Sequence, residues 1–137
     1  MLRTFCASVL LIGALTAAGC DNDPDTPDTP TAPNPVSDTF TGTINVNGAA
    51  THTFTVGPAG VVTATLTTVT PDATVQVGFG LGTWNGSNCQ LVLTKDDGLQ
   101  GNAVTGVNSG PGTLCVRIYD VGRMTESLGY TITVVHP

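Results

Sequence analysis

Charged side chains are scarce in this sequence of 137 residues. Only 10% of the residues are Asp, Glu, Lys or Arg, whereas about 25% are charged in an average globular domain. The 4 basic residues are outnumbered by 10 acidic ones, which leaves a formal net charge of -6. Nucleic acids are bound through basic patches, so we expect no nucleic-acid partner. Because 40% of the residues are hydrophobic, the scarcity of charge also argues against disorder across most of the chain.

The motifs of a hydrolase are missing as well. Such an enzyme needs a nucleophile, a base and a group that orients the base. Of the 2 histidines, His52 alternates with apolar residues, which is typical of a partly buried strand position, and His136 is the penultimate residue. We therefore expect no enzymatic activity and no cofactor. None of the serines after residue 30 lies in a G-x-S-x-G pattern; they are Ser37, Ser87, Ser109 and Ser127.

Metal-binding motifs are absent, with one alternative left open. The sequence has no C-x-x-C, no cysteine–histidine spacing that suits zinc, and no EF-hand loop. Calcium binds where carboxylate oxygens cluster, and Asp96, Asp97 and Asp120 are the residues that would form such a cluster. Residues 95–98 equally have the composition of an ordinary turn.

Aromatic residues make up only 5% of the chain. Sugar-binding sandwiches stack aromatic faces on sugar rings, and the best candidates here are Trp84, Tyr119 and Tyr130. Trp84 stands beside Asn85 in a polar loop, so a ligand site formed by Trp84, Asn85 and Tyr119 is one hypothesis. The alternative is that these aromatic residues are core or loop anchors.

Long apolar runs are also missing, apart from residues 5–18 near the N-terminus. This run follows Arg3 and ends in small residues, which is typical of a secretory signal peptide. A membrane-spanning helix needs about 20 apolar residues, so the run is too short to cross a bilayer comfortably.

The end of that run, Leu15-Thr16-Ala17-Ala18-Gly19-Cys20, resembles the lipobox of bacterial lipoproteins. The resemblance implies that Cys20 is acylated and becomes the new N-terminus, so that lipid attaches the protein to a membrane. The expected location is the bacterial cell envelope, at the outer membrane or cell surface in preference to the inner membrane. The alternative is an ordinary secretory cleavage that leaves Cys20 as a free thiol.

Four cysteines divide cleanly under this interpretation. Cys6 leaves with the signal peptide and Cys20 carries the lipid. In an exported protein the remaining two, Cys89 and Cys115, are expected to form a disulfide. A metal pair or redox dithiol is the alternative, and no motif supports it.

A proline-rich segment separates Cys20 from the rest of the chain. Proline fixes φ and lacks the backbone donor, so this segment forms neither helix nor sheet. It is expected to act as a tether, about 50 Å long if mostly polyproline II. We therefore divide the chain into a signal peptide (1–19), the lipidated cysteine and tether (20–37) and one domain (38–137). The prolines of the tether are Pro24, Pro27, Pro30, Pro33 and Pro35.

Beyond residue 38 apolar residues alternate with threonine, the period of a half-buried β-strand. Glycine-rich turns recur at short intervals, and Gly78, Gly80 and Gly82 leave one face of a strand almost without side chains. We predict an all-β fold, an antiparallel β-sandwich of jelly-roll or immunoglobulin-like type with about seven or eight strands and one disulfide. The expected inward rows are Phe40, Ile44, Val46; His52, Phe54, Val56; Val62, Ala64, Leu66; Val75, Val77, Phe79, Leu81; Leu114, Val116, Ile118; and Tyr130, Ile132, Val134.

The domain resembles the bacterial pre-peptidase C-terminal domain, a small β-sandwich attached to exported proteins. Three stretches carry the resemblance, which spans most of residues 40–135: residues 53–66, 112–119 and 129–134. It implies a non-catalytic accessory or binding role. Some relatives bind calcium through two acidic residues before the central strand, but here Asp72 is followed by Ala73 and Thr74, so that site is not carried over.

Three functions stay open at this point. The first is a binding or adhesion module for a protein or an envelope polymer. The second is a carbohydrate-binding module. The third is a structural envelope component that self-associates through exposed edge strands, with residues 78–82 as the expected place of assembly.

Overall fold

The computed structural model describes residues 31–137, which contain eight β-strands. No helix in this part of the chain is long and apolar enough to cross a membrane. The predicted signal peptide, Cys20 and the first part of the predicted tether lie outside the described residues. The strands are β1 (Val36–Ile44), β2 (Ala49–Val56), β3 (Gly60–Thr70), β4 (Val77–Trp84), β5 (Cys89–Gly98), β6 (Ala103–Asn108), β7 (Gly112–Tyr119) and β8 (Leu128–His136).

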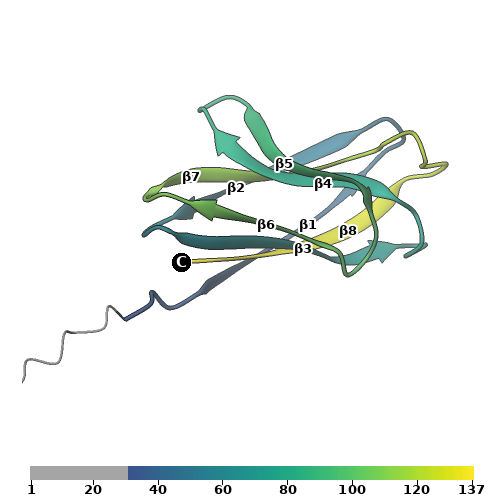
Figure 1. The fold of residues 1–137 in the computed structure, drawn as a ribbon. Helices are drawn as coiled ribbons and strands as arrows, with labels where there is room; N and C mark the ends of the chain where they lie inside the picture. The colour runs from purple at the N-terminus through teal and green to yellow at the C-terminus, as the bar shows by residue number, and fades with distance from the viewer. Residues whose placement is uncertain (1–30) are drawn as a thin grey trace, which may run out of the picture. The chain divides into compact units, whose positions relative to one another are not determined.

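The strands form two antiparallel sheets of four strands each. Sheet A has the order β1-β8-β3-β6, and sheet B has the order β2-β7-β4-β5. Figure 1 shows the two sheets as layers, with sheet B above sheet A in that view. The predicted antiparallel β-sandwich is therefore confirmed.

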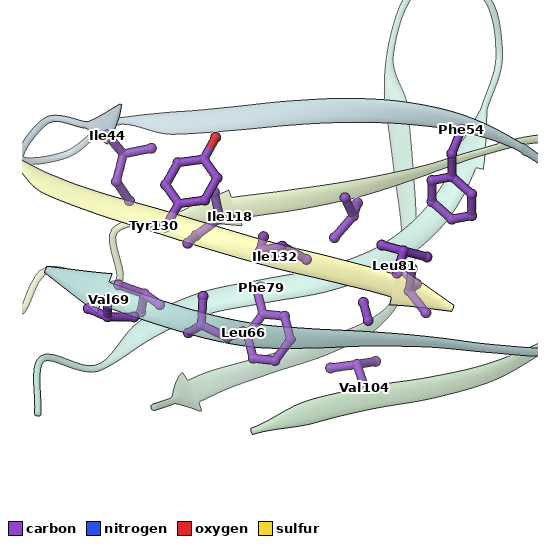
Figure 2. Packing of buried hydrophobic residues seen from close by; sticks show 14 of the residues in the cluster. Ile44, Phe54, Leu66, Val69, Phe79, Leu81, Val104, Ile118, Tyr130 and Ile132 are labelled. Carbon is purple, nitrogen blue, oxygen red and sulfur yellow. The ribbon is translucent and has the colours of Figure 1, made fainter. Parts of the chain in front are cut away.

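The hydrophobic core lies between the two sheets and consists of the inward members of the alternating rows. Figure 2 shows Phe79 and Ile118 of sheet B meeting Leu66 and Ile132 of sheet A. These four side chains are fully buried, because each strand turns alternate residues to the same face. The period-2 pattern of the sequence thus predicted most of the core correctly.

Two strand boundaries differ from the expectation. The turn after β1 is closed by a hydrogen bond from the Gly48 N–H to the Asn45 carbonyl at 2.7 Å. Val46, expected to face inward, therefore lies in the turn and is 42% exposed. Residues 95–98, which have the composition of a turn, instead belong to β5, whose last residue Gly98 pairs with Val77.

The glycine-rich strand β4 lies inside sheet B, between β7 and β5. A Cβ atom on Gly80 would lie 2.2 Å from the Leu93 carbonyl oxygen, and one on Gly82 would lie 2.2 Å from the Gln90 carbonyl oxygen. The β5 backbone thus packs closely on the glycine face. The expectation that residues 78–82 form an exposed edge for assembly is wrong, because both sides of β4 are already paired. The edge strands are β1, β6, β2 and β5.

Cys89 of β5 and Cys115 of β7 form the predicted disulfide, with their sulfur atoms 2.07 Å apart. The two cysteines lie on the strands that flank β4. Cys115 on β7 pairs with Gly82 on β4. The disulfide therefore joins β5 to β7 across the glycine strand.

The chain enters the sandwich at Val36, where β1 begins. Val36 pairs with His136, and the loops β2–β3, β4–β5 and β6–β7 lie at this same end (Figure 1). We call it the tether end. The other loops, including the turn that holds Val46, lie at the opposite end.

Candidate functional site: an apolar groove at an open edge

The two edges where the sheets meet differ in how they are filled. At the β1–β2 edge, the rings of Phe40 and His52 stack with their centroids 4.9 Å apart, and His52 Nε2 lies 2.7 Å from the Tyr130 hydroxyl oxygen. At the β5–β6 edge, a groove with a volume of about 350 Å³ runs between the sheets at the tether end. Aromatic side chains therefore fill the β1–β2 edge, whereas the β5–β6 edge is open and is the candidate site.

The groove reaches from the surface to the core. Buried Val56, Val62 and Leu81 contribute to its lining, so its inner part consists of core side chains. Residues 108–114, which comprise the end of β6, the following loop and the start of β7, line another part. The lining is mainly aliphatic or glycine and contains no charged residue.

Strand β5 forms one rim of the groove because it is bulged there. Leu81 pairs with Leu93, whereas the next residue, Gly82, pairs with Leu91, so Val92 has no partner on β4. Val92 is 70% exposed, and Val107 on the other rim is 81% exposed. A bulge re-aims side chains locally, and here both rims present aliphatic side chains to solvent.

Leu93 and Asn108 define the groove at closer range. A Cβ atom on Gly106 would lie 2.6 Å from Leu93 Cδ1, so the Leu93 side chain lies against β6.

The Asn108 Nδ2 donates to the carbonyl oxygens of Pro58 at 2.8 Å and Gly110 at 3.0 Å. This fixes the amide, and the buried Oδ1 finds no hydrogen-bond partner among residues 31–137. An unsatisfied buried acceptor costs about 1–3 kcal/mol.

The three residues predicted to bind a ligand are not brought together. Trp84 is half-buried at the tether end, and Asn85 Oδ1 caps the following turn by accepting the backbone N–H groups of Ser87 and Asn88 at 3.0 and 2.8 Å. Tyr119 pairs with Gly78, six residues before Trp84 on β4, which corresponds to about 20 Å along a strand. Trp84 and Tyr119 therefore cannot stack on one sugar ring.

Tyr119 instead forms a local polar pair at the other end of β4. Its hydroxyl donates to the Asp96 carboxylate, and burial together with this hydrogen bond raises the pKa of Tyr119 to about 12. Tyr119 also lines a shallow hollow of about 390 Å³ with Arg117 and Asp120. This hollow lies away from the groove.

The predicted calcium ligands form no common site. Asp97 pairs with Lys95 at 2.9 Å, and Asp120 accepts backbone N–H groups from its own turn and from Asn47. The hydrogen bond from Asn47 is the main cause that lowers the pKa of Asp120. Across residues 31–137 no group of three acidic, histidine or cysteine side chains could hold a metal ion. The prediction that Asp96, Asp97 and Asp120 cluster is therefore not supported.

The two histidines have structural positions. His136, to which the sequence pattern assigned no role, is buried, and its Nε2 lies 3.1 Å from Asp38 Oδ2. This contact joins the end of β8 to the start of β1. His52 is partly buried, as predicted, in the cluster that fills the β1–β2 edge.

The partial burial of His52 makes stability depend on pH. Burial lowers the pKa of His52 from 6.5, so the unfolded chain binds its proton at a higher pH than the folded chain does. Stability is therefore lost as the pH falls through the range just below 6.5. We expect the Tm to drop a few degrees more between about pH 7.5 and about pH 5.5 in the wild type than in a His52→Gln variant. An identical pH dependence of Tm in both proteins would contradict this.

Reasoning from the sequence missed the groove. Nothing in the sequence pattern singled out Leu93, Val92 or Val107 as members of a site. One feature of the sequence could have indicated the groove. Val61 and Val107 stand at outward positions that threonine occupies elsewhere in the strands. Comparisons with protein-family models and with curated proteins find no match for the chain.

Proposed function

We propose that this protein is a lipid-anchored lipoprotein of the bacterial cell envelope whose β-sandwich is a non-catalytic binding module, with the β5–β6 groove as its binding site. The lipobox-like sequence that ends at Cys20 supports the anchor. The groove is the observation that carries the binding function. Ligand sites are typically concave and mostly apolar, with few polar groups.

The groove favours an apolar ligand. Its rims expose Val92 and Val107 to solvent, so covering them removes aliphatic surface from water at about 25 cal/mol per Å². Asn108 also lines the groove, and its Oδ1 is buried. The lining carries no charge that would hold an ionic ligand in place.

A neutral apolar dye tests the site. We expect N-phenyl-1-naphthylamine to bind the mature protein with a rise in fluorescence, and Leu93→Ser to weaken binding about fivefold to tenfold because it removes aliphatic contact area. Val61→Ser is the matched control. Val61 is also an exposed aliphatic residue, but it lies outside the groove lining.

The two variants separate a specific site from general hydrophobicity. Unchanged dye binding in Leu93→Ser, or an equal loss in Val61→Ser, would reject the groove as the binding site. Thermal melts of both variants establish that the fold is retained.

A further inference from the structure

Few charged residues lie at the tether end of the described domain. The tether-end loops, residues 57–59, 85–88 and 109–111, contain none. Among described residues near that end, Asp38 is charged and lies against His136 at 3.1 Å. The loops of the opposite end carry Asp72, Asp120, Arg123 and Glu126.

Exposed aliphatic side chains have the reverse distribution. Of the seven large hydrophobic residues exposed in the described domain, only Val46 lies at the opposite end, in the β1–β2 turn. Large exposed apolar areas rimmed by polar residues mark interaction surfaces. The six on the tether-end side are Val36, Val61, Val92, Leu93, Val107 and Val135.

The chain itself indicates what this end meets. The residues between Cys20 and Val36 join the domain here, so this is the end that a lipid at Cys20 would hold toward the bilayer. Residues 21–35, which separate Cys20 from Val36, are few enough that a lipid at Cys20 would keep this end within reach of the membrane. Trp84 is half-buried at the same end, and tryptophan is favoured at membrane–water interfaces.

We propose that the tether end is a bilayer-docking face and that the groove receives an acyl chain of a membrane phospholipid. The proposal rests on the lipid anchor and the groove proposed above, and it names their common partner. Docking buries the exposed valines in the interfacial layer, while the charged loops of the opposite end stay in water.

The charge of the domain indicates the type of lipid. Residues 32–137 hold 6 acidic and 3 basic residues, so the formal net charge of this part of the chain is negative (3 − 6 = −3). Attraction to anionic headgroups therefore contributes nothing. We expect neutral phosphatidylcholine vesicles to bind at least as well as vesicles that contain phosphatidylglycerol.

The experiment uses the mature chain with Cys20→Ser, which carries no lipid of its own. Trp84 is the 1 tryptophan of the sequence, so its emission reports on the tether end directly. We expect a blue shift with phosphatidylcholine vesicles and quenching by brominated lipid. Val61→Asp/Val92→Asp should weaken vesicle binding at least about tenfold, whereas Val46→Asp, the same type of substitution at the opposite end, should leave it intact.

The outcomes separate this proposal from the proposed function. Absence of a Trp84 shift, or equal losses in both variants, would overturn docking. Dye binding without vesicle binding would keep the groove and reject the membrane as its partner. Val61→Asp alone should reduce vesicle binding and keep dye binding, because Val61 lies outside the groove. The mass of the native protein tests acylation of Cys20 independently.

Discussion

Replacing both Cys89 and Cys115 with alanine should lower the free energy of unfolding by about 3–4 kcal/mol, the chain-entropy value for a loop of this length. The cysteines are 26 residues apart, and the reduced chain gains conformational freedom mainly in the unfolded state. For a domain of this size we expect the Tm to fall by about 15 °C or more. The measurement is a thermal melt of wild type and variant at neutral pH.

A reducing agent provides the control for this prediction. It should lower the Tm of the wild type to nearly that of the double variant and leave the variant unchanged. The disulfide also joins β5 to β7, so its loss should weaken dye binding in the groove. A Tm change of less than about 5 °C would show that packing of the two strands, and not the covalent bond, holds this region together.

Gly80→Val should strongly destabilise the domain. A Cβ at this position meets backbone atoms of β5, with the Leu93 carbonyl oxygen 2.2 Å away, and backbone cannot move aside as a flexible side chain can. Overpacking of this kind costs about 1–3 kcal/mol and occasionally more. We expect a loss of at least about 3 kcal/mol by denaturant unfolding, together with loss of dye binding, because β5 forms one wall of the groove.

Gly57→Val is the matched control for Gly80→Val. A Cβ on Gly57 meets nothing within 4 Å, so this variant carries the same added side chain without the collision. Equal stability of the two proteins would mean that β5 does not pack against the glycine face.

The fold was largely predictable because burial imposes a short repeat. Residues such as Leu66, Phe79 and Ile132 stand at alternate positions, and a strand with one wet face buries alternate side chains. The disulfide was predictable for a similar reason, since an exported chain with two remaining cysteines favours pairing. These are local or compositional signals that need no knowledge of which strands are neighbours.

The site was not predictable, because it depends on strand order. The glycines of β4 suggested an exposed assembly edge, and only the pairing with β5 and β7 places that strand inside a sheet. Trp84 and Tyr119 look equally suited to sugar stacking in the sequence, but the register puts them far apart. The bulge at Val92 depends on how β5 curls over Gly82.

By itself the sequence determined the strand pattern, most of the core, the disulfide and the expectation of a lipid anchor at Cys20, because each follows from residue type and spacing. Only the tertiary structure decided which edge of the sandwich stays open, and that the exposed valines gather at the end opposite the charged loops. Those features arise from contacts between residues distant in the chain, such as Leu93 on Gly106 and His52 on Tyr130. The spacing of residues along the chain does not show which distant residues come into contact.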